Sequence, residues 1–340
     1  GTLLLDLNRL DEALAAFDTA IALTGGFAEA YLNKSYCLLR MGLYEEGWRL
    51  HEWRKKTERP VGHRSFPQPL WLGREGIANK TVFVHWEQGF GDTLQFCRYA
   101  NLLRARGANV IMSVQEPLYR LISHSMPGIR LLKGDVAPAA FDYHCPLMSL
   151  PLAFGTTLQN VPAAVPYLFA DDERRKIWEA RLPPQTKLRI GVGWSGNARQ
   201  KNDFNRSIGL AAFAPIVAVD AHWISLQKEV RDVDRPLLES FRQISHYGEL
   251  LTDFSDTAAV IAGLDLVVTV DSSVAHLACA MGKPAWILLA FTADWRWLVD
   301  RDDCPWYPTA RLFRQETPHA WDGVAGHVLT ALASFVKDPH

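Results

Sequence analysis

Several segments of the chain consist almost only of apolar residues, and each is as long as one buried β-strand. Leu266–Val270 and Ala285–Leu289 are the purest examples, and Leu188–Gly193 and His222–Leu226 precede them. Stretches long enough to form helices separate these segments. Strands that are apolar along their whole length are typical of parallel sheets covered by helices on both faces. The pattern therefore predicts an α/β fold.

A similar alternation occurs earlier in the chain. Thr81–Trp86 and Asn109–Val114 have the composition of strands, and the amphipathic stretch Thr93–Arg106 between them predicts one helix. Phe141–Cys145 is a further candidate strand. The chain has 340 residues, more than twice the roughly 150 expected for one domain, so its length fits two α/β domains.

The first 54 residues carry a different pattern, which repeats every 34 residues. Leu10 returns as Tyr44 and Glu12 returns as Glu46. This is the period of two-helix tetratricopeptide units, and it predicts helical hairpins. One and a half such units cannot form a stable solenoid alone. They either pack on the next domain or continue an array outside this sequence.

Proline and glycine separate the helical part from the rest. Pro60, Pro67 and Pro69, together with three glycines, indicate a linker. The predicted organisation is helical hairpins at 1–59, a linker at 60–79, α/β domains at 80–170 and 171–318, and a C-terminal helix at 319–340.

Composition excludes several classes of protein. Lys+Arg 36 against Asp+Glu 37 gives a formal net charge of -1, which offers no basic surface for nucleic acid or for an anionic membrane. The five cysteines are widely spaced and form no CxxC, so neither a disulfide framework nor a zinc cluster is expected, and a reducing, cytoplasmic location fits best. We expect no transmembrane segment, because no apolar run approaches about 18 residues, and no signal peptide is visible.

The first loop that follows a predicted strand is Glu87–Gln95. Its two glycines allow close approach of a ligand, but Leu94 stands where a dinucleotide-binding GxGxxG motif needs its third glycine. A nicotinamide enzyme is therefore disfavoured. Asp92, with Gln95 three residues later, matches a capping box, so its structural interpretation is an N-cap.

Two later loops carry groups suited to phosphate. Ser272 and Ser273 begin a helix directly after a buried strand, where free N–H groups attract anions. Arg206, in the loop after Gly193, brings positive charge to a chain that is neutral as a whole. Each group also has a purely structural interpretation. Asp271 can be a helix cap, His276 can be a hydrogen-bonded core histidine, and the loop with Arg206 can be a solvated charged loop.

Three motifs in the same order resemble bacterial tetratricopeptide proteins with a heptosyltransferase-like domain of glycosyltransferase family 9. They are Gly89–Gln95, Gly193–Asn197 with Arg206–Ile208, and Val270–Ala278. The similarity spans nearly the whole chain. Further similar stretches in the C-terminal part are Asp294–Trp297, Cys304–Pro308 and Arg311–Gln315.

The resemblance implies the GT-B architecture, in which two Rossmann-like domains face a cleft. It implies that Asp92 is the catalytic base beside an acceptor loop of Gln88, Gly89 and Gly91. Ser272 and Ser273 replace the usual Thr-Gly of the family. The residues assigned to donor binding are Trp194, Ser195, Gly196, Asn197, Lys201, Arg206, Gln227, Asp271, Ser272, Ser273 and His276.

The predicted function is transfer of a sugar from a nucleotide-sugar donor to a hydroxyl of a polypeptide or glycan. We expect inversion at the anomeric carbon, no bound metal and no cofactor, with the nucleotide sugar as substrate. The helical repeat is a candidate for acceptor recognition. Two alternatives stay open: a tetratricopeptide scaffold with a degenerate transferase domain, and a phosphosugar epimerase of GT-B fold.

Overall fold

The computed structural model describes residues 1–62, 64–200 and 202–337, which form two compact units. Unit 1 comprises residues 1–119, 126–163 and 292–301. Unit 2 comprises residues 120–125, 164–291 and the chain from residue 302 onward.

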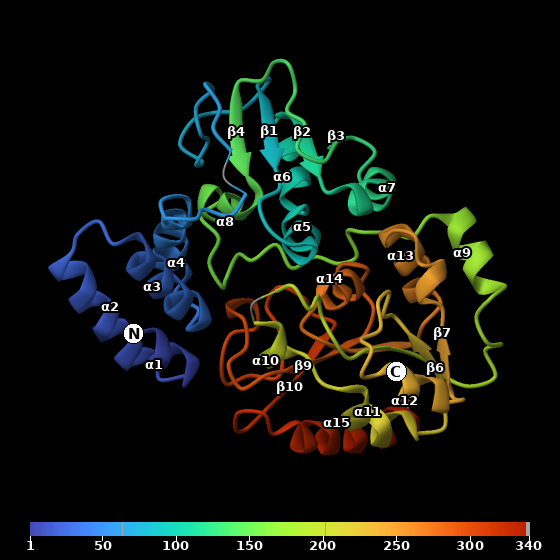
Figure 1. The fold of residues 1–340 in the computed structure, drawn as a ribbon. Helices are drawn as coiled ribbons and strands as arrows, with labels where there is room; N and C mark the ends of the chain where they lie inside the picture. The colour runs from blue at the N-terminus through green and yellow to red at the C-terminus, as the bar shows by residue number, and fades with distance from the viewer. Residues whose placement is uncertain (63, 201, 338–340) are drawn as a thin grey trace. The chain divides into compact units, whose positions relative to one another are not determined.

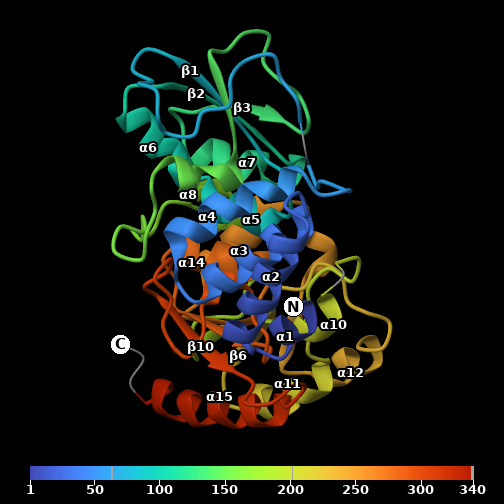
Figure 2. The same cartoon turned by 90° about the vertical axis from the view of Figure 1, so that its left-hand side faces the viewer.

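Unit 1 begins with a helical segment whose helices pack in chain order (Figure 2). The helices are α1 (Thr2–Asp6), α2 (Leu10–Leu23), α3 (Ala28–Arg40) and α4 (Tyr44–His51), followed by the 3-10 helix η1 (Glu52–Lys55). Leu10, Phe17 and Cys37 belong to their shared core. Leu10 and Tyr44, the first residues of α2 and α4, are one 34-residue period apart. The predicted helical hairpins are confirmed, and their identity as tetratricopeptide units stays a prediction.

The stretch at 60–79 lies against the first sheet. Its described residues contain no helix. Leu70 forms a parallel bridge with His144, and the Trp71 N–H donates to the His144 carbonyl over 2.9 Å. Because the Trp71 side chain is fully buried, these residues are part of the packing of unit 1 and not only a connection.

The sheet of unit 1 is parallel, with strand order β3-β2-β1-β4 (Figure 1). Its strands are β1 (Thr81–His85), β2 (Asn109–Val114), β3 (Arg130–Lys133) and β4 (Tyr143–Pro146). The chain adds β2 and β3 on one side of β1 and then returns to place β4 on the other side. The strand order therefore reverses between β1 and β4, and ligands of open parallel sheets bind at the carboxyl ends of the strands that flank such a point.

Connecting helices follow the strands. They are α5 (Phe90–Phe96), α6 (Tyr99–Ala105) and α7 (Glu116–Ser125), with η2 (Leu147–Ser149) and α8 (Leu150–Ala153) after β4. The prediction of one helix over Thr93–Arg106 was wrong, because two helices meet at Cys97 and Arg98. The Arg98 Nε donates to the Gln95 carbonyl over 2.8 Å, so a side chain uses the acceptor that a continuous helix gives to the Tyr99 N–H.

The sheet of unit 2 is also parallel, with strand order β10-β9-β8-β5-β6-β7. Its strands are β5 (Arg189–Gly193), β6 (His222–Ser225), β7 (Ile244–His246), β8 (Leu266–Val270), β9 (Ala285–Leu289) and β10 (Ala310–Arg314). The chain adds β6 and β7 on one side of β5 and β8 to β10 on the other. The order reverses between β5 and β8, which marks the expected ligand edge of this sheet.

Helices cover both faces of the second sheet (Figure 1). Val192, Val268 and Leu288, at alternate positions of their strands, share one core with α11 (Leu210–Val217) and α15 (Trp321–Phe335). On the other face, α14 (Ser273–Ala280) contacts β8 and β9. The remaining helices of this unit are α9 (Asp172–Glu179), α10 (Asp203–Arg206), α12 (Arg235–Ser240), η3 (Gly248–Leu250) and α13 (Phe254–Ala262).

All five cysteines lie among the described residues, and all are buried free thiols. Among the described residues, no helix is both long enough and apolar enough to cross a membrane.

Candidate active site

The loop after β1 places Asp92 at the start of α5. Gly89 is the N-cap of this helix, and Asp92, at its third position, accepts a hydrogen bond from the Gly89 N–H at Oδ2 over 2.7 Å. Asp92 was predicted as the N-cap with Gln95 as its partner, and both assignments were wrong. The helix begins three residues earlier than that prediction, so Asp92 is itself the acidic residue that reaches back to the cap.

The other carboxylate oxygen of Asp92 is bound by Arg296. Arg296 Nη2 forms an ion pair with Asp92 Oδ1. The same guanidinium donates from Nε to Gln95 Oε1 over 2.7 Å and from Nη1 to Asp294 Oδ1 over 2.8 Å. The Asp92 side chain is 16% exposed and that of Arg296 is 8% exposed, so the pair is largely removed from water.

These surroundings shift the pKa of Asp92 upward. Burial is the largest cause, and the nearby Asp294 and Glu87 carboxylates add to it. The Arg296 charge and the Gly89 N–H oppose this rise, because both stabilise the ionised form. Asp92 is thus a carboxylate with raised basicity, which suits a group that must accept a proton.

The predicted acceptor loop is tied to the neighbouring strand. Gln115, directly after β2, donates from Nε2 to the Gln88 carbonyl over 3.0 Å and to the Gly89 carbonyl over 3.3 Å. Gln115 Oε1 in turn accepts from the Thr93 hydroxyl over 2.8 Å. Gly91 lies within the first turn of α5. The structure therefore brings Gln88, Gly89 and Asp92 into one ordered turn.

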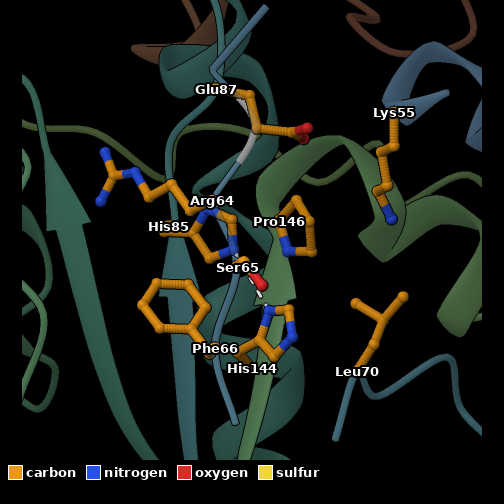
Figure 3. Close-up of a pocket in the computed structure, with 9 residues that line it drawn as sticks. All are labelled: Lys55, Arg64, Ser65, Phe66, Leu70, His85, Glu87, His144 and Pro146. Atoms are coloured by element: carbon orange, nitrogen blue, oxygen red, sulfur yellow. Dashed lines mark hydrogen bonds between the residues drawn. The ribbon is translucent and has the colours of Figure 1, made fainter. Parts of the chain in front are cut away.

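A cavity of about 210 Å³ lies where the strand order of the first sheet reverses (Figure 3). β1 contributes His85 and β4 contributes His144 and Pro146. Figure 3 shows the rings of Phe66, His85 and His144 together on one side and Lys55 on the opposite side. The full lining is Lys55, Arg64, Ser65, Phe66, Leu70, His85, Glu87, His144 and Pro146.

The cavity has charged and neutral parts. Arg64 pairs with Asp135, and Glu87 pairs with the buried Arg54 over 2.8 Å. His85 Nε2 lies 3.4 Å from His144 Nδ1. Burial lowers the pKa of His85 to about 3, and the Arg64 charge acts in the same direction, so the His85 ring is neutral at physiological pH. No local sequence pattern marks this cavity, because its residues come from η1, the 60–79 stretch, two strands and the loop after β1.

In unit 2, the loops after β5 and β6 meet through Gln227. Its Nε2 donates to the Ser195 hydroxyl over 2.9 Å, and its Oε1 accepts from the Ser195 N–H over 3.3 Å. Both side chains are buried. Two residues assigned to donor binding from separate loops are thereby joined at the ligand edge of the second sheet.

Arg206 joins the loop after β5 to the loop after β8. Its Nη1 donates to the Asp271 carbonyl over 2.9 Å, and its Nε lies 3.4 Å from Asp203 Oδ1. Asp203 also binds Arg231 and accepts from the Ser207 hydroxyl over 2.9 Å. A Cβ on Gly196 would stand 2.4 Å from Arg206 Nη2, so a larger residue here would force the end of the Arg206 side chain to shift. Asp203 and Arg231 carried no sequence signal that identified them.

The loop after β8 places Ser272 at the N-cap of α14 and Ser273 at its first position. The Ser272 side chain makes no cap hydrogen bond at this helix end. About one turn further along α14, His276 is buried and its Nδ1 lies 2.9 Å from the Tyr307 hydroxyl. This contact agrees with the interpretation of His276 as a satisfied core histidine.

The remaining donor-binding candidates lie in different surroundings. The Trp194 indole is fully buried, and its Nε1 donates to Asp234 Oδ2 over 3.0 Å. Asn197 is exposed and accepts from the Arg199 N–H over 2.9 Å. Lys201 lies outside the described residues. Trp194 is therefore a core residue, whereas Asn197 lies on the surface of its loop.

Comparison with known proteins shows similarity to glycosyltransferases. Residues 247–325 match the model of glycosyltransferase family 9 (heptosyltransferase). Protein FlbA of Caulobacter vibrioides is 26% identical over 362 aligned positions, which cover 97% of this chain. The chain spans 60% of the length of that relative.

Solved structures show the same fold. E. coli ADP-heptose LPS heptosyltransferase II has a TM-score of 0.54 at 15% identity, over 76% of this chain and 99% of that one. A family 9 glycosyltransferase from Veillonella parvula has a TM-score of 0.52 at 11% identity, over 78% of this chain and 99% of that one. The predicted fold, two parallel-sheet α/β domains like those of GT-B heptosyltransferases, is confirmed, and the findings support a glycosyltransferase.

Proposed function

We propose that the protein transfers a sugar from a nucleotide-sugar donor to a hydroxyl group of a polypeptide or glycan, with inversion and without a bound metal. The observation that carries this proposal is the family 9 match at residues 247–325, because it includes the start of α14 at the ligand edge of the second sheet. A phosphate-bearing donor is the ligand class that a helix N-terminus at such an edge favours.

The donor diphosphate fits the residues around the start of α14. The backbone N–H groups at the start of α14 have no partner within the helix, and Arg206 supplies positive charge beside the Asp271 carbonyl. These groups would stabilise the nucleoside diphosphate as it leaves with the bonding electron pair. ADP-heptose is the first donor to test, because the similar E. coli heptosyltransferase is named for it.

Asp92 is the proposed general base. As the acceptor oxygen attacks the anomeric carbon, the hydroxyl proton passes to the Asp92 carboxylate and the bond from that carbon to the diphosphate breaks. The raised pKa of Asp92 makes it a stronger base than an exposed aspartate. The adjacent cavity, with Lys55, Glu87 and the histidine pair, is the proposed site for the acceptor group.

A two-step experiment tests the function. Thermal unfolding is first measured with ADP-heptose and with UDP-, GDP- and CMP-sugars, since a ligand at 100 times its Kd stabilises the fold by about 2.7 kcal/mol. Hydrolysis and transfer of the stabilising donor are then compared between the wild type and Asp92→Asn. We expect the variant to bind the donor and to lose most of its turnover.

Other outcomes select the alternatives. Absence of stabilisation by every nucleotide sugar contradicts the transferase and favours the scaffold. An altered sugar nucleotide formed without any acceptor indicates the epimerase. A folded Asp92→Asn variant with wild-type transfer removes Asp92 from the mechanism.

A further inference from the structure

Arg296 reaches Asp92 from a distant part of the sequence, on the 3-10 helix η4 (Trp295–Trp297). Three of its nitrogens are used within unit 1: Nη2 on Asp92, Nε on Gln95 and Nη1 on Asp294. Asp294 also caps η4, because its Oδ1 accepts from the Arg296 N–H over 3.1 Å. A guanidinium held by three acceptors in different directions has one defined orientation.

Trp295 connects the same short helix to the helical segment. Its ring meets the Trp48 ring of α4 edge to face, with centroids 5.1 Å apart, and the His51 ring lies 6.4 Å away. The Arg296 guanidinium lies 4.1 Å from the centroid of the Trp295 ring. Trp48 and Trp295 are 2% and 3% exposed, so this contact is part of the core of unit 1.

The backbone after η4 adopts a conformation that needs support. Leu298 has a φ of 56°, in the left-handed region that side chains other than glycine rarely adopt, and Asp300 has a φ of 53°. Leu298 is buried. Such a conformation persists where surrounding packing holds it, and it is typical of segments that place a functional group.

We propose that Arg296 is the positioning residue of Asp92 and that α4, through Trp48 against Trp295, holds Arg296 in place. The role depends on Asp92 being the base proposed above. It makes the helical segment part of the catalytic unit, in addition to any part in acceptor recognition. Arg296 fixes one carboxylate oxygen, and the Gly89 N–H fixes the other.

The charged and titratable groups that surround Asp92 allow this idea to be tested. Arg296 and Asp294 approach from η4, Glu87 from the loop after β1, and Tyr36 from α3. Glu87 is paired with Arg54. Arg296 is therefore the cation that forms an ion pair with Asp92, and its removal leaves the carboxylate with burial and two acidic neighbours.

The test measures the titration of Asp92 in the free protein and needs no substrate. Protein labelled with ¹³C at the aspartate carboxyl carbons is titrated by NMR, and Asp92 is assigned by the signal missing from Asp92→Asn. We expect Arg296→Gln to raise the pKa of Asp92 by about 1–3 units. Arg296→Lys, which keeps the charge but not the planar fork, should restore part of this shift.

A second variant tests the contribution of the helical segment. Trp48→Leu should also raise the pKa of Asp92, but by less than Arg296→Gln does. Arg49→Gln, on the same helix with a 67% exposed side chain, is the matched control and should leave the titration unchanged. Melting temperatures establish that each variant is folded.

The outcomes separate this inference from the proposed function. An unchanged Asp92 pKa in folded Arg296→Gln and Arg296→Lys overturns the role of Arg296. A wild-type titration in folded Trp48→Leu overturns the role of α4. If these variants behave as expected while Asp92→Asn keeps full transfer, the electrostatic coupling stands and the proposed base is wrong.

Discussion

Arg206 Nη1 donates to the backbone carbonyl of Asp271 over 2.9 Å and so links the loops that follow β5 and β8. These are the two strands between which the order of the second sheet reverses. The guanidinium thus lies within the edge where a diphosphate is expected, and it also holds the two loops together.

Arg206→Ala should therefore weaken nucleotide-sugar binding and also lower the melting temperature. Loss of a charged hydrogen bond costs about 1.5–3 kcal/mol, which corresponds to roughly 10- to 150-fold in Kd. Isothermal titration measures this change. Arg206→Lys should recover part of the affinity, and Arg235→Ala, whose side chain is 61% exposed on α12, is the control. Wild-type affinity in Arg206→Ala would return Arg206 to a structural role.

Transfer should continue in the presence of a chelator. Within the described residues, no group of three or more His, Cys, Asp or Glu side chains is placed to hold a metal ion, and Arg206 can neutralise diphosphate charge. The measurement is the rate of transfer with EDTA, compared with EDTA followed by excess magnesium or manganese. Loss in EDTA with recovery on metal addition contradicts this prediction.

A substitution in the cavity wall should weaken acceptor binding and leave donor hydrolysis unchanged. Lys55→Met keeps an unbranched side chain, one atom shorter, and removes the charge at the cavity wall. We therefore expect an acceptor KM raised about 10-fold, the effect of roughly 1.4 kcal/mol, with donor hydrolysis unchanged. Lys56→Met is the matched control, because Lys56 is the next residue and is exposed. Equal KM values for the two variants would place the acceptor elsewhere.

The neutral His85 ring makes stability depend on pH. Its folded pKa of about 3 lies below the ordinary value of 6.5, so between these pH values the unfolded chain binds more protons. The free energy of unfolding therefore falls as pH falls through this window, and the loss for this one group between pH 7 and 5 is about 2 kcal/mol.

Urea unfolding at the two pH values measures this loss. His85→Asn should lose less stability than the wild type on acidification, and His327→Asn, at an exposed position of α15, should follow the wild type. His51 is also buried with a lowered pKa and adds to the wild-type slope. A His85→Asn slope equal to that of the wild type contradicts the assignment.

The sequence predicted the strands whose apolar composition indicates that they are buried. β8 and β9 are almost entirely apolar and β1 and β2 are rich in apolar and β-branched residues, and the ends of β1 and β8 correctly located the loops with Asp92 and Ser272. β3 was missed because it is a short edge strand that begins and ends with the exposed Arg130 and Lys133. Edge strands lack the burial on both faces that makes an apolar run.

The sequence patterns could not predict contacts between residues that lie far apart in the chain. Arg296 is 204 positions from Asp92, and nothing in the local pattern of either residue indicates the other. His85 and His144 are 59 positions apart, and only the parallel pairing of β1 with β4 brings them together. A local motif identifies a residue that follows a strand, whereas the contacts that tune this residue come from the tertiary fold.

The exposed face of the helical segment provides the last prediction. Trp48 packs inside unit 1, so for this residue the packing interpretation holds, whereas Leu23 and Phe27 are 82% and 45% exposed at the end of α2 and the loop that follows. Helical hairpins with exposed apolar residues suit polypeptide binding.

We expect Leu23→Ser with Phe27→Ser to keep the melting temperature and donor hydrolysis and to reduce transfer to a polypeptide acceptor. Val233→Ser, 83% exposed in unit 2, is the matched control and should preserve both activities. Equal preservation of hydrolysis and transfer in the double variant would leave the segment with its packing role alone, and the acceptor would then be selected at the cavity beside Asp92.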